Sequence, residues 1–252
     1  MEKLIKLLIL VLGLSLTRCS SVLYQVVELE PKNTQTNNDG YPIFENDTVR
    51  ITYSFWDKNG IMAFQIFNKS NKDLYINWEK SSFIVNSQKF KYWEDKTTIS
   101  SGAVYLSKKK AGYFDNFGVG LSSSTIVKDE KISFIPPQSY IYKYTYVLHP
   151  GNYFPLSPNQ KKIYVKKDDT QPRSTVRNVY YIQDTFTENN SPMMFRNYLN
   201  FSFEESFIQK FSYDNAFYVK KVLEFEKRLK DTLFVKAHYS FYKETTSNYR
   251  AK

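Results

Sequence analysis

Apolar and polar residues alternate along several stretches of this chain. The alternation runs through residues 49–55 and returns in residues 61–67 and 140–147. A period of two is typical of a strand that buries one face. Asn59 and Gly60 separate the first two stretches, and an Asn-Gly pair tolerates the positive φ angles of a tight hairpin turn. We therefore expect these two stretches to pair as an antiparallel hairpin.

Short strand-like segments continue beyond the hairpin. Residues 74–78, 82–85, 89–93 and 132–135 are rich in apolar and aromatic side chains, with turn-forming residues between them. Such residues suit a pleated, half-buried surface, and strands of this length and spacing are typical of a sandwich or barrel. The sequence therefore predicts a mainly β protein built as an antiparallel β-sandwich. Five residues are expected to share its core: Ile51, Tyr53, Phe64, Ile66 and Leu74.

A charged, turn-rich segment at residues 166–174 offers the clearest boundary in the chain. Residues 19–168 are expected to form the sandwich domain with an N-terminal tether, closed by a strand at residues 163–165. Residues 169–252 form a β-rich C-terminal segment. The sequence leaves open whether that segment is a separate domain or continues the first sheet.

The C-terminal segment contains one ambiguous stretch, residues 217–225. Its odd positions, among them Phe217 and Val219, suit a strand, whereas Val219 and Val222 also suit one face of a helix. A strand is preferred because residues 233–241 alternate clearly and are able to pair back across the intervening turn.

The N-terminus has the layout of a secretory signal peptide. A short basic flank precedes an uncharged run at residues 7–16, and Cys19 follows shortly after it. The run is too short for a membrane-spanning helix, which needs about 20 residues. Residues 1–18 are therefore expected to be removed on export.

Leu16-Thr17-Arg18-Cys19 resembles a bacterial lipobox, although Arg18 stands where these signals normally have a small residue. The resemblance implies that Cys19 is acylated, that cleavage falls before it, and that a lipid bearing chains such as palmitate holds the protein to a membrane. Two or three chains anchor a protein firmly. The alternative is an ordinary signal peptide cut after Ser21.

The segment after Cys19 bears on where the folded part sits. Residues 31–40 read as a polar loop, which is expected to let the domain stand off from the bilayer. The residues just after Cys19 lack the acidic run of surface-export signals, so the expected location is the outer membrane, facing the periplasm.

Residues 64–70 and 74–81 resemble a hairpin of immunoglobulin-like domains found in lipoproteins of Bacteroidetes-type bacteria. This resemblance implies an immunoglobulin-like β-sandwich in the cell envelope. It brings no known catalytic residue and no cofactor.

Composition narrows the choice of partners. The formal net charge is +10, but the lysines are scattered between apolar positions, as on solvated strand edges and turns. Nucleic acid is therefore not an expected partner. Because Cys19 is the sole cysteine, a lipidated chain has no thiol left for a disulfide. Its stability must come from a packed core.

Candidate catalytic residues are few. His149 and His238 are the only histidines, and the chain has no Gly-x-Ser-x-Gly elbow and no metal-binding motif. An envelope hydrolase with a site scattered around one of these histidines stays an alternative, because triad residues are distant in sequence.

Aromatic side chains offer another route to function. Exposed tryptophan and tyrosine stack on ligands or anchor protein partners, which makes Trp56, Trp78 and Trp93 the candidate ligand-binding residues. The sequence thus predicts a cell-envelope lipoprotein with a binding or structural role, toward an envelope protein or a glycan. A carbohydrate-binding module and a hydrolase are the alternatives.

Overall fold

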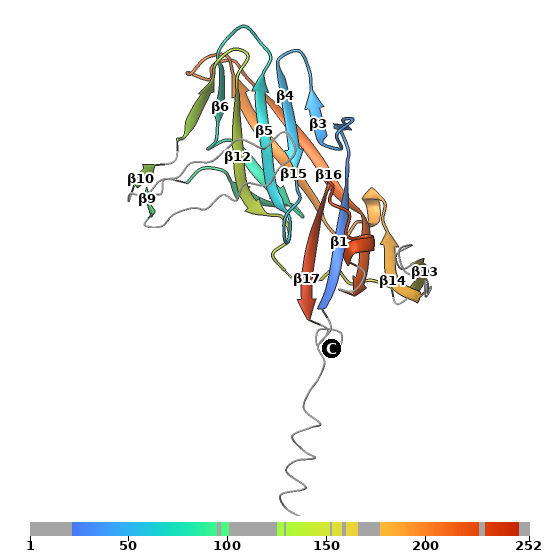
Figure 1. Ribbon diagram of the computed structural model, residues 1–252. Helices are drawn as coiled ribbons and strands as arrows, with labels where there is room; N and C mark the ends of the chain where they lie inside the picture. The colour runs from blue at the N-terminus through green and yellow to red at the C-terminus, as the bar shows by residue number, and fades with distance from the viewer. Residues whose placement is uncertain are drawn as a thin grey trace, which may run out of the picture.

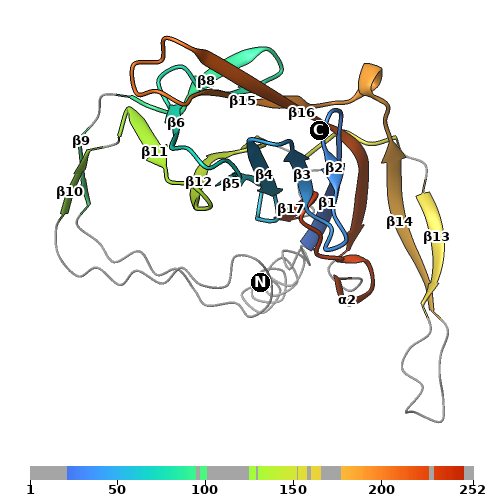
Figure 2. The same ribbon diagram turned by 90° about the horizontal axis from the view of Figure 1, so that it is seen from above.

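The computed structural model describes residues 22–94, 97–100, 125–128, 130–151, 153–157, 160–165, 177–226 and 230–246. Antiparallel strands dominate these residues, and they form two main sheets (Figures 1 and 2). The described helices are single turns, η1 (Glu188–Asn190) and α2 (Lys230–Leu233). The prediction of a mainly β, antiparallel sandwich is confirmed. An immunoglobulin-like strand order is not established.

The larger sheet has ten strands, and its main path runs β11-β6-β15-β16-β1-β17. Two branches extend it: β7 and β8 join at β15, and β14 and β13 join at β16. The strands are β1 (Val22–Pro31), β6 (Leu74–Asn77), β7 (Ser82–Val85), β8 (Gln88–Lys91), β11 (Ile132–Ile135), β13 (Gln160–Val165), β14 (Arg177–Thr185), β15 (Met194–Ser202), β16 (Lys210–Glu226) and β17 (Ser240–Thr246).

The smaller sheet has five strands in the order β12-β5-β4-β3-β2. A separate two-stranded sheet pairs β9 (Thr97–Ser100) with β10 (Thr125–Lys128) in antiparallel fashion. The strands of the five-stranded sheet are β2 (Gln35–Thr36), β3 (Pro42–Glu45), β4 (Val49–Ser54), β5 (Ile61–Asn68) and β12 (Tyr140–Val147).

The main core lies between the two sheets and is strongly aromatic. Phe55 packs edge-on against Phe195 and Phe217, with ring centroids 5.4 and 5.0 Å away. Such arrangements contribute beyond the area they bury. All five residues expected in one core belong to this cluster: Ile51, Tyr53, Phe64, Ile66 and Leu74.

The predicted hairpin is confirmed: β4 and β5 pair in antiparallel fashion, and Asn59 and Gly60 have φ angles of +64° and +72°. Its loop also has a tertiary role. The amide of Asn59 donates to the carbonyl of Tyr242 over 2.7 Å, and the amide of Tyr242 donates to Asp57 over 3.2 Å. The loop therefore covers the outer edge of β17 and links the two sheets.

The two parts of the chain on either side of residue 168 share the larger sheet, since β15 lies between β6 and β16. Two strand expectations are wrong. Residues 163–165 do not close the first unit, because β13 pairs with β14, which pairs with β16. Residues 233–241 do not pair with β16, because β1 occupies that edge and β17 pairs with β1 instead.

The expected stand-off loop is also placed differently. Residues 22–31 form β1, which lies between β16 and β17 in the larger sheet. Residue 31 ends β1, and the rest of the expected loop is held to the body: the amide of Lys32 donates to Ala216 and the side chain of Asn33 donates to Asp214. Residues 31–40 cannot separate the domain from an anchor at Cys19, because the strand enters the sheet first.

Candidate functional site

The lipidation candidate, Cys19, lies outside the described residues, as does the signal segment 1–18. The three tryptophans lie within them. Trp78 is 3% exposed and belongs to the main core, so it has no ring face for a ligand. Trp56 is half-buried against Phe234, 5.2 Å between centroids. Trp93 is half-buried, with the Nζ of Lys131 5.5 Å from its ring centroid.

A buried lysine lies beside the first candidate histidine. Lys243 is 1% exposed, and its Nζ lies 2.8 Å from Nδ1 of His149. The same ammonium donates to the carbonyls of His149 and Gly151, over 2.7 and 2.9 Å. Burial lowers the pKa of Lys243 to about 8. Desolvation, with a contribution from Lys243, lowers the pKa of His149 to about 4.

Lys243 begins a polar row that crosses three strands. Gln25 on β1 lies opposite both Lys243 on β17 and Glu224 on β16. Its side-chain amide donates to Glu224 over 3.0 Å and to the carbonyl of Phe154 over 2.9 Å, and its oxygen accepts from the amide of Phe154. Gln25 thus holds the backbone of Phe154 against the sheet. The polar atoms of the row bind the protein itself, which indicates a structural role.

The second candidate histidine contacts a serine. Nδ1 of His238 lies 3.0 Å from Oγ of Ser54, at the end of β4. The buried ring of Tyr41 stacks on the imidazole, with 3.5 Å between centroids. Desolvation, followed by the charge of Lys236, lowers the pKa of His238 to about 4, against a smaller opposing effect of Asp39.

A serine beside a histidine is the arrangement a hydrolase requires. A general base works best with a pKa near the operating pH, and His238 lies well below neutrality. One face of its ring is covered by Tyr41. The carbonyl of His238 also accepts from the amide of Phe55 over 2.8 Å. These contacts favour a structural attachment of the segment before β17 over catalysis.

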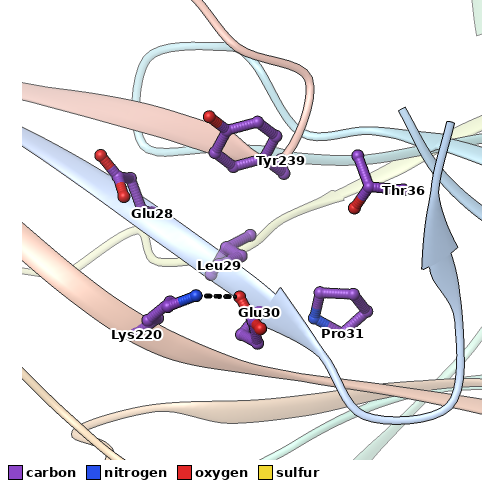
Figure 3. A pocket seen from close by; sticks show the side chains of 7 residues that line it. All are labelled: Glu28, Leu29, Glu30, Pro31, Thr36, Lys220 and Tyr239. Carbon is purple, nitrogen blue, oxygen red and sulfur yellow. Dashed lines mark hydrogen bonds and ion pairs between the residues drawn. The ribbon is translucent and has the colours of Figure 1, made fainter. Parts of the chain in front are cut away.

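A small depression lies nearby, between β1 and the start of β17 (Figure 3). It has a volume of about 200 Å³. Glu30 in its wall forms an ion pair with Lys220 over 2.7 Å, and Glu28 forms one with Lys221. These partners already satisfy its charged lining, and neither Ser54 nor His238 lines it.

An exposed line of tyrosines is the remaining candidate. Tyr140, Tyr142 and Tyr144, here called the tyrosine row, occupy alternate positions on β12, at the edge of the smaller sheet. Ile141 between them packs against the main core, so the row faces outward. Tyr140 and Tyr144 are 54% and 57% exposed. Tyr142 accepts a hydrogen bond from Gln65 over 3.1 Å.

Neighbouring strands extend this surface. Phe67 on β5 lies opposite Tyr140, and Arg50 on β4 lies opposite Phe67. The guanidinium carbon of Arg50 lies 5.0 Å from the ring centroid of Phe67. Aromatic faces and polar donors therefore alternate across this end of the outer face, a combination suited to ligands that are both apolar and hydroxylated.

Within the described ranges, the protein has neither a candidate metal site nor a helix suited to crossing a membrane. No group of three or more His, Cys, Asp or Glu side chains is placed to hold a metal ion there. Nor does any helix in those ranges have the length and apolar character to cross a membrane. Compared with known proteins, the chain matches no family model, no curated protein and no solved structure.

The tyrosine row was visible in the sequence as a strand but not as a site. The alternation of residues 140–147 predicts β12, yet it does not say which face is buried, because both alternating sets contain large apolar side chains. The signal that singles out the row is exposure of Tyr140 and Tyr144, which depends on the position of β12 at a sheet edge.

Proposed function

We propose that this chain is a lipid-anchored binding protein of the bacterial cell envelope, and that its tyrosine row binds an extended glycan. The observation that supports the proposal is the outward alignment of Tyr140 and Tyr144, each more than half exposed, on one edge strand. Exposed apolar surface gathered in one place, rather than scattered singly, is typical of interaction sites, and the row gathers three aromatic side chains on one strand.

The geometry suits a linear polymer better than a compact ligand. Residues on the same side of a strand are about 6.6 Å apart, so the three rings form a line rather than a pocket. The rings of Tyr140 and Tyr142 meet at 66°, with 5.1 Å between centroids. Tyrosine adds area and a hydroxyl at low conformational cost. A sugar ring needs both an apolar contact and hydrogen bonds.

The anchor in this proposal is Cys19, with its acyl chains in the outer membrane and the domain in the periplasm. Its support is the apolar run that ends shortly before the sole cysteine. A partner protein on the tyrosine row is the alternative outcome, and the experiment below separates the two.

The first test measures glycan retention by affinity electrophoresis. We expect the full chain to be retarded in gels containing a soluble polysaccharide from a panel of neutral glucans, xylans and mannans, or to sediment with isolated peptidoglycan. Replacing Tyr140 and Tyr144 together by Ala should weaken that binding at least tenfold, or about 1.4 kcal/mol, because both stacking surfaces are lost.

Phe134→Ala is the matched control. Phe134 is 58% exposed, close to the values of the two tyrosines, but it lies on β11 in the larger sheet. Its replacement should leave retention unchanged. No retention by any glycan, or equal retention by the double variant and the parent, contradicts the proposal. If a protein co-purifies with the parent and with Phe134→Ala but not with the double variant, the tyrosine row binds a protein partner instead.

The anchor is tested separately. Cys19→Ala should move the protein from the membrane fraction to the soluble fraction of cells, because the acyl chains have no other attachment point. Mass spectrometry of the mature N-terminus provides the direct measurement. An unmodified chain beginning at Val22 would show that the signal peptide is cut after Ser21 and that no lipid is attached.

A further inference from the structure

The end of the larger sheet that follows Cys19 carries a second hydrophobic cluster, separate from the main core. Its buried members are Tyr24, Val26 and Phe225. Phe234 and Leu233 cover it from the segment before β17. Phe234 packs edge-on against Tyr24, with 5.6 Å between centroids, and lies 5.2 Å from Trp56. This cluster places aromatic side chains beside the first residues of β1.

The outermost part of the cluster has exposed apolar surface with one lysine before it and one after it in the chain. Val235 is 67% exposed, next to the half-buried Phe234. Lys230 precedes these residues and is exposed, with its Nζ 5.0 Å from the ring centroid of Phe234. Lys236 follows them and is also exposed. We call Lys230, Phe234, Val235 and Lys236, together with Trp56, the anchor-side patch.

The spacing of the chain brings this patch close to the proposed lipid. Only Ser20 and Ser21 separate Cys19 from Val22, the first residue of β1. Three residue steps span at most about 11 Å. Tyr24, which contacts Phe234, lies only two residues further along. A lipid on Cys19 therefore holds the patch within reach of the headgroups.

We propose that the anchor-side patch is a membrane-contact surface, on which Val235 and Phe234 enter the phospholipid headgroup layer while the two lysines face lipid phosphates. Apolar and aromatic side chains flanked by lysine are the composition of interfacial membrane contacts. This proposal rests on the acylation of Cys19. It implies that the domain lies tilted on the bilayer and leaves the far end of the sheet pointing away.

The far end supplies a matched reference. Ile208 is 80% exposed and lies between β15 and β16, just before Lys210. The opposite end of β16, Glu226, pairs with Leu23. Seventeen residues of strand separate these ends, a contour of roughly 50 Å, and Figure 1 shows them at opposite ends of the body. Ile208 therefore has the apolar exposure of Val235 without its proximity to the anchor.

The experiment places one fluorophore on either residue. Val235→Cys and Ile208→Cys are each labelled with a thiol-reactive, polarity-sensitive dye in the full lipidated protein. The proteins are then inserted in phosphatidylcholine vesicles containing phosphatidylglycerol and a lipid that carries a quencher near its headgroup. We expect at least threefold stronger quenching at position 235 than at position 208. Adding Lys236→Glu to the first variant should reduce that quenching, because a lysine that faces phosphates is replaced by a carboxylate.

The parent protein separates the two ways of failing. If Cys19 is acylated, the parent has no free thiol and takes up no dye, since it has no other cysteine. Dye uptake by the parent overturns the anchor itself. An unlabelled parent whose mature N-terminus is Val22 by mass spectrometry has lost Cys19 with the signal peptide, and this also overturns the anchor. If mass spectrometry shows an acylated Cys19, equal or weaker quenching at position 235 than at position 208 overturns the membrane-contact surface and leaves the anchor intact.

Discussion

Gly60→Ala is expected to lower the free energy of unfolding by roughly 3 kcal/mol, from backbone strain and overpacking together. Gly60 has a φ of +72°, where an L-residue is strained. A Cβ at this position would lie 2.9 Å from Cγ of Phe241 and 3.1 Å from Cβ of Leu148. Both atoms are close to their own backbones, so neither is able to move away cheaply.

Substitutions at two other glycines separate the contribution of backbone strain from that of overpacking. Gly40 has a φ of +81°, but a Cβ there would meet only a side-chain atom of Tyr239 at 4.0 Å, so Gly40→Ala should cost about 1 kcal/mol from strain alone. Gly151→Ala, with ordinary contacts and no left-handed backbone, should change little. Urea denaturation of chains carrying Cys19→Ala measures all three. Equal losses at positions 60 and 40 would show that the close contacts relax without cost.

The second large effect is a loss of stability in acid. The folded state holds the pKa of both His149 and His238 at about 4, below the value near 6.5 of an unfolded histidine. Between these values the unfolded chain binds more protons, so stability is fully present above about pH 6.5 and is lost as the pH falls toward 4. With allowance for partial exposure, each histidine is expected to contribute about 2 kcal/mol.

The control is the double variant His149→Gln and His238→Gln, which removes every histidine from the chain. Urea midpoints at pH 7, 5 and 4 should show the parent losing roughly 4 kcal/mol more than the double variant. Carboxylates titrate in both proteins and cancel in this difference. Parallel losses in the two proteins would mean that the histidines titrate normally in the folded state.

Each histidine also helps to hold a different segment of the chain in place. Protonation of His149 places a charge beside the ammonium of Lys243, which helps hold the segment around Gly151 against β17. Protonation of His238 changes the contact with Ser54 that holds the segment before β17. Each single variant should therefore show about half of the extra loss of stability that the parent shows, relative to the double variant, between pH 7 and pH 4.

The strands of this protein follow from local sequence. The alternation around Asn59-Gly60 predicted the β4–β5 hairpin, because a period of two and a turn that accepts positive φ are both local properties. The same reasoning identified β12 and the core positions of β4 and β5. It did not find the bound segments beside Lys243 or Ser54, whose partners are 94 and 184 residues away in sequence.

The ambiguity in residues 217–225 has a tertiary cause. In the register of β1 with β16, Glu28 faces Lys221 and Leu29 faces Val219, so Lys220 is an extra residue in β16. This bulge shifts the face that packs on the main core from odd to even positions, and Val219 and Val222 both belong to that core as a result. Spacing of three between buried residues therefore resembled a helix.

Strand pairing in the tertiary structure decides the strand order and which side chains are exposed. The sequence by itself determined that the chain forms antiparallel strands, because side-chain alternation is read within one strand. Only the tertiary structure decided that β1 lies between β16 and β17, that Trp78 is buried, and that the tyrosine row is exposed at an edge. Strand order and register depend on contacts between residues far apart in the chain, and the sequence of one strand does not specify which strands it pairs with.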